Sequence, residues 1–480
     1  MRSGILYMEK SQQKESKNEE IEQNNIVYSI NFETKTASVI RSPKADGDII
    51  IPKSIKYKTF EYIVKSISKR AFIVSKIKSL QFPTDSELQT IENKAFMYSS
   101  IESISLPSSV TELKKGWCTK AFNLSEIIIS PNNKRYCCLD EKYIIGKSSI
   151  EKEYYDELIF AVRNIEIAFI PSFIECIKSF AFCECKLLKT INIPVNSELR
   201  IIENEAFSFS SIERLTLPAK LIDLRDLWCN VTESLTYVDV DPNNPRYAVY
   251  GENHKMIIGK SSIENDEYDV LNFCARDIEK VTIPSFIKHI ASNAFHLCNC
   301  ITNVEFPADS KLETIEKFAF ANSSIPSLKV PHHLHTICQR AFIYCSQFQS
   351  IDIPMDSELK TIEAEAFYDC PIFYLNIPQK LVDLKEGWCE SMENVIHINV
   401  SPDNPRYMAY DNDKLVIGKS SIDDEYDSII FCNRDVKTIK IPSFIKYIGS
   451  NAFERCSLSS VEFETTTQLL TIGKDAFNGS

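Results

Sequence analysis

The chain has 480 residues, of which 44% are hydrophobic and 25% are charged, a composition typical of a folded protein. Its formal net charge of −12 argues against binding to nucleic acids or to anionic membranes, because both attract basic surfaces. It contains no run of about 18 apolar residues, so we expect no transmembrane segment.

The N-terminal segment, residues 1–25, is rich in Lys, Glu, Gln and Ser and is predicted to be a disordered tail. It lacks the apolar core of a signal peptide, which favours a cytoplasmic location. A cytoplasmic chain would keep its sixteen cysteines reduced, whereas export by another route would allow disulfides. The sequence leaves both locations open.

A short repeat organises residues 71–480. A hydrophobic residue followed by proline recurs every 23 or 24 residues, as at Pro284, Pro307, Pro331 and Pro354, and an Ala-Phe pair keeps the same interval. One such repeat cannot bury its apolar face alone, but stacked repeats bury a continuous core. The interval therefore predicts a solenoid with a parallel sheet along one side.

One repeat, residues 187–207, illustrates how each coil is expected to fold. Ile191 and Ile193 are two residues apart, so they lie on the same face of a strand. Pro194 ends this strand because proline cannot donate a ladder hydrogen bond. The following Ala-Phe pair is expected on a short helical or 3₁₀ turn, with Phe207 filling the core below the next coil.

Three longer islands interrupt the short repeat, near residues 118–165, 229–277 and 389–435. Each contains Gly-Lys-Ser, the end of a phosphate-binding loop, but such a loop also needs a glycine five residues earlier. Three copies of an incomplete motif favour a repeated hairpin over a nucleotide site. The residues at the position of the missing glycine are Glu141, His254 and Asp413.

The tryptophans and most cysteines are interpreted as core residues. Trp117, Trp228 and Trp388 fall roughly where Phe stands in ordinary coils, with ligand stacking as the alternative. Closely spaced cysteines, such as Cys298 and Cys300, lack the second pair and the nearby histidines of a zinc site. We therefore expect buried thiols, no metal and no cofactor.

Histidines are scarce, but His332, His333 and His335 cluster after Pro331 in a turn that is expected to be exposed. Chance affinity for a metal is an alternative there, and no function is assigned to the cluster. No Ser/His/Asp or Cys/His arrangement can be placed on a common geometry. We therefore expect no catalytic residue and no enzyme activity.

The pattern I-x-x-x-A-F-x-x-C, after a strand that ends in proline, resembles the BspA-like (Treponema-type) leucine-rich repeat. The resemblance covers about residues 26–480 and implies a leucine-rich repeat solenoid of mixed β structure with short helical or 3₁₀ turns. The matching strand patterns predict a parallel concave sheet of roughly fifteen coils with three β-hairpin islands. The resemblance implies a capping hairpin with the first coil in residues 26–70. The pattern is clearest in residues 289–298, 336–345, 361–370 and 447–456.

The resemblance further implies non-enzymatic protein binding, as in surface antigens and adhesins that bind host proteins or other cells. The alternative is an intracellular interaction scaffold of the same fold, which the absent signal peptide favours. A third hypothesis, an enzyme that uses the Gly-Lys-Ser segments, predicts nucleotide binding that Lys260→Ala abolishes. The last coil has no polar capping repeat, so three alternatives are open: a truncated chain, oligomerisation through this coil, or a frayed terminus.

Solvent-facing positions on the strands of the sheet are the predicted partner-binding residues. An extended sheet is how repeat solenoids bind partners, and aromatic side chains are better hot-spot candidates than isolated charges. The alternative is a face that is merely solvated. The predicted partner-binding residues are Asn192, Arg214, Tyr237, Asp239, Lys280, Asn303, Glu305, Asp352, Tyr374, Asn376, His397 and Lys440.

Overall fold

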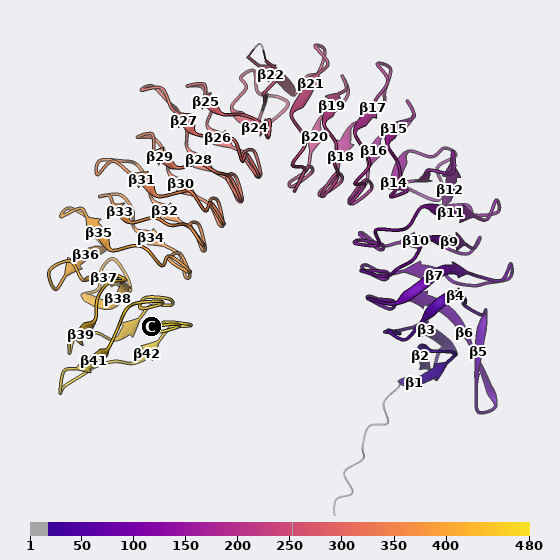
Figure 1. Cartoon of the computed structure of the whole chain (residues 1–480), viewed down its shortest axis with the longest axis horizontal. Coiled ribbons are helices and arrows are strands. Elements are labelled where there is room, and N and C mark those ends of the chain that lie inside the picture. The colour runs from indigo at the N-terminus through magenta and orange to yellow at the C-terminus, as the bar shows by residue number, and fades with distance from the viewer. Residues whose placement is uncertain (1–17, 252) are drawn as a thin grey trace, which may run out of the picture. The chain divides into compact units, whose positions relative to one another are not determined.

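The computed structural model describes residues 18–251 and 253–480, which form a β-solenoid of about 19 turns (Figure 1). The chain consists of two compact units, and the boundary between them lies between Asn164 and Ile165. The described residues form strands and turns, with no helix that is long and apolar enough to cross a membrane. The leucine-rich repeat solenoid is confirmed, but it has more coils than the fifteen expected.

The N-terminal residues form antiparallel strands that precede the regular coils. Of the tail predicted for residues 1–25, residues 1–17 lie outside the described residues, whereas Asn18–Gln23 forms strand β1. β1 pairs antiparallel with β2 (Ile26–Asn31), which gives its backbone groups hydrogen-bonding partners. β2 in turn forms a hairpin with β3 (Thr36–Val39).

The first unit contains three sheets, with strand orders β1-β2-β3-β6-β8-β10, β11-β9-β7-β4 and β12-β13-β14, and β5 also pairs with β6. β4 pairs in parallel with β7, and the Ala-Phe pair of Ala71 and Phe72 lies between the two strands, so a coil begins at β4. The remaining strands of this unit are β4 (Asp46–Ile50), β5 (Ser54–Tyr57), β6 (Phe60–Ile67), β7 (Lys76–Gln81), β8 (Thr90–Ile91), β9 (Ser103–Leu106), β10 (Glu112–Leu113), β11 (Glu126–Ile129), β12 (Tyr136–Leu139), β13 (Tyr143–Gly146) and β14 (Glu157–Ala161).

The second unit contains two kinds of parallel ladder, one of longer strands and one of two-residue strands that also includes the island hairpins. The longer strands are β15 (Ile167–Phe169), β17 (Thr190–Asn192), β19 (Arg214–Leu217), β21 (Tyr237–Val240), β25 (Lys280–Thr282), β27 (Asn303–Glu305), β29 (Ser327–Lys329), β31 (Ser350–Asp352), β33 (Tyr374–Ile377), β35 (His397–Val400), β39 (Thr438–Ile441) and β41 (Ser460–Phe463).

The second ladder begins with two-residue strands and is joined by the two islands of this unit. Each island contributes three antiparallel strands, which confirms the predicted hairpins. The strands of this ladder are β16 (Cys176–Ile177), β18 (Ile201–Ile202), β20 (Asp223–Leu224), β22 (Tyr247–Tyr250), β23 (Met256–Gly259), β24 (Val270–Cys274), β26 (His289–Ile290), β28 (Thr314–Ile315), β30 (Thr336–Ile337), β32 (Thr361–Ile362), β34 (Asp383–Leu384), β36 (Tyr407–Tyr410), β37 (Leu415–Lys419), β38 (Tyr426–Cys432), β40 (Tyr447–Ile448) and β42 (Thr471–Ile472).

Each coil of the second unit therefore has three sides, which we name the long-strand face, the short-strand face and the turn face. The turn face consists of the Ala-Phe turns. Within this unit, Figure 1 shows the long strands on the outer side of the curve and the Ala-Phe turns on its inner side. The concave side is thus formed by the turns, and not by the sheet of long strands as expected.

The Ala-Phe turns differ from the helical or 3₁₀ turns that were predicted. In the turn around Ala294 and Phe295, Asn293 has a φ of 63° and Leu297 a φ of 59°. Left-handed residues four apart cannot belong to a right-handed helix, so the chain makes two successive tight turns instead. The carbonyl of Ala319 accepts a hydrogen bond from the Phe295 N–H, which joins this turn to the next coil.

A ladder of phenylalanine rings fills the interior, as the sequence predicted. The fully buried rings of Phe295 and Phe320 stack with their centres 4.5 Å apart, and Phe342 follows at 5.0 Å. Trp228 occupies the place of a phenylalanine, between Phe207 and Phe273, with centre distances of 6.2 and 6.0 Å. Its burial confirms the interpretation of the tryptophan as a core residue.

Candidate functional site

The predicted partner-binding residues all lie on strands of the long-strand face, and none of their side chains is buried. Arg214 and Thr216 are exposed on β19, for example, whereas Leu215 and Leu217 are buried. This alternation follows from the period of two in a β-strand. Exposure makes these residues accessible to a partner, while binding itself stays a prediction.

Four residues beside the second island contact one another, and we name them the Arg214–Tyr237 cluster (Arg214, Tyr237, Asp239 and His254). Arg214 and Tyr237 are paired across β19 and β21, and the guanidinium lies 4.7 Å from the ring centre of Tyr237. The His254 ring stacks on Tyr237 at 5.1 Å, and its Nδ1 lies 3.1 Å from Oδ1 of Asp239. These contacts favour one orientation of the tyrosine ring.

We name each island, together with the coils directly before and after it, a block. In the third block the pair that corresponds to Arg214 and Tyr237 is Tyr374 and His397, which are paired across β33 and β35. Their ring centres are 6.3 Å apart in an edge-on arrangement. The same two positions of the repeat thus carry ring contacts in both blocks, with different residues. His254 was missed as a contact residue because it reaches the long-strand face from the island hairpin loop, and only the folded island brings it there.

The other predicted residues contact only their neighbours. Asn303 donates from Nδ2 to Oε1 of Glu305 at 2.6 Å, and both line a groove of about 550 Å³ on the long-strand face. Asn376 donates to the carbonyl of Ile353 at 3.0 Å. The remaining residues lie opposite a residue of the adjacent strand, in the pairs Asn192 with Phe169, Lys280 with Asn303, Asp352 with Lys329 and Lys440 with Glu462.

The Gly-Lys-Ser segments are hairpin turns closed by a buried aspartate. In the second island, the N–H and the hydroxyl of Ser261 each donate to a carboxylate oxygen of Asp269 at 2.7 Å. In the third island, Ser420 binds Asp427 in the same way, at 3.0 and 2.8 Å. A phosphate would need the serine N–H that this internal carboxylate already occupies, so the geometry favours the hairpin over a nucleotide site.

The buried asparagine of each island also has structural partners. Asn244 donates from Nδ2 to the carbonyls of Pro218 and Leu221, and its Oδ1 accepts from the N–H groups of Arg246 and Tyr247, all within 2.9 Å. The asparagine is buried, so these bonds satisfy four backbone groups that water does not reach. The same arrangement is made by Asn133 and Asn404.

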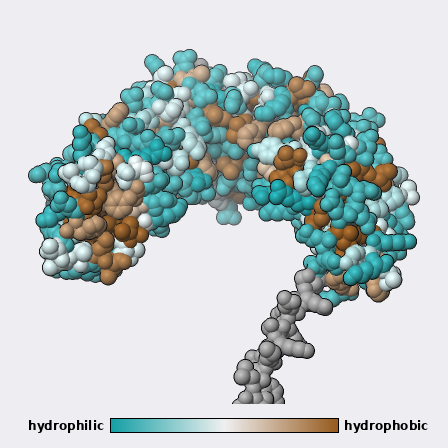
Figure 2. Space-filling view, turned by 60° about the horizontal axis from the view of Figure 1, so that its bottom comes forward, coloured by the Kyte–Doolittle hydropathy of each residue, from teal (hydrophilic) through white to brown (hydrophobic). Residues whose placement is uncertain are grey.

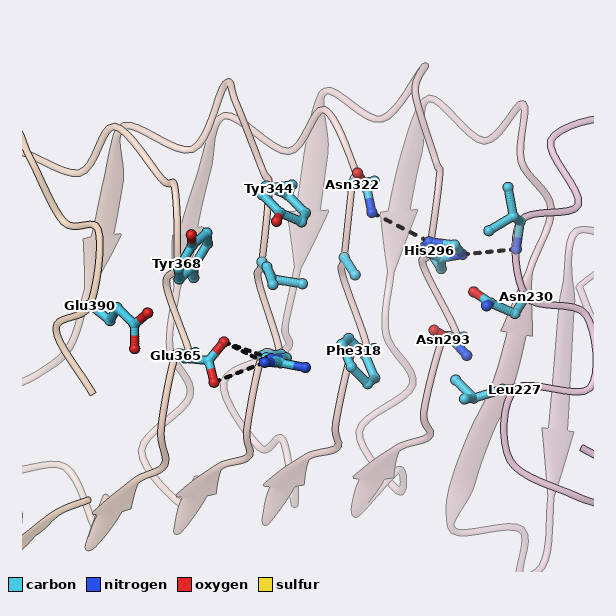
Figure 3. A pocket seen from close by; sticks show the side chains of 14 residues that line it. Leu227, Asn230, Asn293, His296, Phe318, Asn322, Tyr344, Glu365, Tyr368 and Glu390 are labelled. Carbon is cyan, nitrogen blue, oxygen red and sulfur yellow. Dashed lines mark hydrogen bonds and ion pairs between the residues drawn. The ribbon is translucent and has the colours of Figure 1, made fainter. Parts of the chain in front are cut away.

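A second candidate surface is a groove of about 530 Å³ on the turn face, between residues 227 and 390 (Figure 3). Its walls come from the Ala-Phe turns of successive coils. The rings of Tyr344 and Tyr368 meet edge-on with centres 5.5 Å apart. Arg340 donates from Nε and Nη2 to the carboxylate of Glu365 at 2.7 and 3.0 Å, as the dashed lines in Figure 3 show.

A buried histidine closes one end of this groove. The Nδ1 of His296 accepts from the Val231 N–H at 3.4 Å, and its Nε2 lies 3.5 Å from the amide nitrogen of Asn322. Burial, and then the positive charge of Arg276, lower the pKa of His296 to about 3, so the ring is neutral near pH 7. Sequence reasoning missed this groove. The one available signal was that the residues flanking Ala-Phe vary between coils while the pair itself does not.

One group of side chains in residues 18–251 and 253–480 has the spacing of a metal site, namely His332, His333 and Glu358. Hydrogen bonds from His333 and then from Lys380 lower the pKa of Glu358 to about 2, so its carboxylate is ionised at neutral pH. The histidines are exposed, as predicted. The carboxylate partner was not predicted because it belongs to the next coil.

Solved structures of low sequence identity align along most of the chain. A leucine rich cell surface protein from Faecalibacterium prausnitzii is 16% identical, with a TM-score of 0.44, and the alignment covers 93% of this chain and 95% of that protein. The pneumococcal vaccine antigen PcpA is 18% identical, with a TM-score of 0.42, and the alignment covers 93% and 99% of the two chains. A search of curated proteins finds no match.

The repeat itself matches a described protein family over most of the chain. The family is the BspA type leucine rich repeat region, with six copies, and the matches cover residues 52–140, 148–251, 267–395 and 424–480. These ranges include the coils and parts of the islands described above. The chain therefore belongs to the BspA type leucine-rich repeat family.

Proposed function

We propose that this chain is a non-enzymatic protein-binding module whose partner contacts the long-strand face around the Arg214–Tyr237 cluster. The observation that supports this most directly is the Tyr237 ring, held between Arg214 and His254 on an accessible strand. Tyrosine and arginine are enriched among the residues that dominate binding energies. A ring that is already held in place also loses less conformational freedom when a partner binds.

The charge of the chain indicates the kind of partner. With a net charge of −12, it is expected to associate fastest with a protein that presents a basic or neutral surface. Asp239, Glu305 and Asp352 supply negative positions on the long-strand face itself. Raising the ionic strength should therefore slow association with a basic partner.

Affinity measurements on variants test the proposed face. Partners captured by the immobilised chain are titrated against the wild type and the double variant Arg214→Ala/Tyr237→Ala. Loss of a hot spot of about 2 kcal/mol should weaken binding roughly 30-fold. The matched control is Tyr344→Ala/Tyr368→Ala on the turn face, which should bind normally. Loss of affinity in the control alone would place the contact in the turn-face groove and contradict the proposal.

Within this function, we favour a surface antigen or adhesin over an intracellular scaffold, because the family includes such surface proteins. Protease shaving and labelling of intact cells with a non-permeant biotin reagent distinguish the two. Labelling of the chain on intact cells supports the adhesin. Protection in intact cells, with labelling only after lysis, supports the scaffold and rejects the adhesin.

We also propose self-association through the last coils of the chain. Leu470 and Ile472 are 70% and 51% exposed, and Phe463 is 43% exposed. Figure 2 shows this apolar patch at the left end of the view, over the C-terminal coils. Sedimentation at increasing concentration should show a dimer that Leu470→Asp removes. A chain that stays monomeric at all concentrations would contradict this proposal.

A further inference from the structure

Three histidines depart from the repeat at one turn of the second unit. The turn between β29 and β30 reads Pro-His-His-Leu-His-Thr-Ile from Pro331 to Ile337, and only Leu334 and Ile337 of this segment are fully buried. The aligned turn after Pro284 carries Ser, Phe and Lys in place of the three histidines. The histidines therefore fill positions that the coil itself does not require to be histidine.

The next coil brings a carboxylate beside these histidines. The Glu358 N–H donates to the carbonyl of His332 at 2.9 Å, and the Lys360 N–H donates to the carbonyl of His335 at the same distance. These backbone bonds fix the two turns against each other. The relative position of His332 and Glu358 is thus set by the solenoid ladder, and not by the side chains alone.

The side-chain distances match those between ligands of one metal ion. Oε2 of Glu358 lies 3.1 Å from Nδ1 of His333 and 3.4 Å from Nε2 of His335. One ligand atom each from His332, His333 and Glu358 lies within 4.8 Å of the other two. In a tetrahedral zinc site with bonds near 2.0–2.1 Å, ligand atoms are about 3.3 Å apart, so only small side-chain movements are needed.

We propose that His332, His333 and Glu358 bind one divalent transition-metal ion of the zinc class, bridging two successive coils. Two imidazoles with one carboxylate suit zinc, copper or nickel, whereas magnesium and calcium prefer oxygen ligands alone. His335 faces the same carboxylate oxygen and supports its orientation. Lys380, 3.2 Å from Oε1, holds the other oxygen and leaves Oε2 for the metal.

The repeat supplies a matched control for this site. Glu198 occupies the corresponding position of an earlier coil, and its Oε1 binds Lys220 at 2.5 Å, as Glu358 binds Lys380. The coil before Glu198, however, has Ser172 and Phe173 in the turn where the later coil has histidines. A metal held by the histidines should depend on Glu358 and not on Glu198.

Titration of the untagged full-length chain with Zn²⁺, in competition with a chromogenic chelator, tests the proposal. All variants carry Cys300→Ser, which removes the exposed thiol. We expect one ion per chain, loss of that binding in His332→Ala/His333→Ala, and binding at least about tenfold weaker in Glu358→Gln. Glu198→Gln should bind as tightly as the parent chain.

Three outcomes would overturn the proposal. The first is no stoichiometric binding to the parent chain, and the second is equal binding by the parent and the histidine double variant. The third is an absorption spectrum, recorded with Co²⁺ in place of Zn²⁺, that shows binding to cysteine. Near-ultraviolet thiolate-to-metal charge transfer would assign the ion to cysteine, whereas visible bands of tetrahedral Co²⁺ without that transition support imidazole and carboxylate ligands.

Discussion

In the islands, the repeated polar residues are buried and bonded to their own chain, whereas on the long-strand face the polar residues are exposed and vary from block to block. Asn244 and Asp269 illustrate the first group, with partners at fixed positions of the coil. Arg214 and Tyr237 illustrate the second, and the next block carries Tyr374 and His397 instead. Motifs that repeat here stabilise the coil, so positions that depart from the repeat are the better candidates for binding.

The largest loss of stability is expected from Asn244→Ala. Truncation leaves two backbone carbonyls and two N–H groups without their buried partner, which should lower the free energy of unfolding by about 3 kcal/mol. Asn303→Ala on the long-strand face should change it by less than about 0.5 kcal/mol. Urea denaturation measures both, and equal effects would mean that the island asparagine is not structural.

We expect His296 to make the stability of the fold depend on pH. The second and third blocks differ at this position. In the third block, Glu454 stands at this position and accepts from the Ser391 N–H and from Nδ2 of Asn451, both at 3.0 Å. Buried His296 stays neutral down to pH about 3, whereas an unfolded histidine binds a proton below about 6.5. The unfolded state therefore holds more protons between these values, and stability falls as the pH drops.

The size of this effect is about 2 kcal/mol at pH 5 relative to pH 7.5, from the two pKa values. His296→Gln keeps a hydrogen-bond acceptor but does not titrate, so it should remove that part of the acid sensitivity. Thermal melts of both chains at the two pH values measure the difference. An unchanged pH dependence in His296→Gln would show that the folded ring is protonated or exposed.

A smaller loss of stability is expected from Asp269→Ala. This substitution removes the acceptor of the Ser261 N–H and hydroxyl at the base of the hairpin, which should cost about 1–2 kcal/mol. Hydrogen exchange should become faster in residues 256–274, and remain unchanged in the third island, where Asp427 is intact. If hydrogen exchange in residues 256–274 is as slow in the variant as in the wild type, the aspartate does not close the turn.

The smallest change in stability is expected from Lys260→Ala. The lysine amine lies over the Tyr268 ring, 5.4 Å from its centre, at the surface of the hairpin. Its loss should change the free energy of unfolding by less than about 0.5 kcal/mol. Equilibrium dialysis with ATP and Mg²⁺ should show no binding to either chain. Binding to the wild type that the variant loses would restore the nucleotide-site hypothesis.

The period of the sequence was sufficient to predict the coils, the phenylalanine ladder and the position of Trp228, because these contacts recur one repeat apart. The geometry of the Ala-Phe turns was not predictable in the same way, since Leu297 adopts a left-handed conformation that its residue type does not suggest. Contacts of His254 and Glu358 were missed because each depends on which residue of another strand or coil lies alongside.

The central claim, that the long-strand face binds the partner, is tested most directly by site-specific photo-crosslinking. A photoreactive phenylalanine is placed at Thr216, beside the Arg214–Tyr237 cluster, or at Asn322 on the turn face; both positions are exposed. The account predicts a crosslinked partner from position 216 and none from position 322. Crosslinking from position 322 alone would contradict it and assign binding to the turn-face groove.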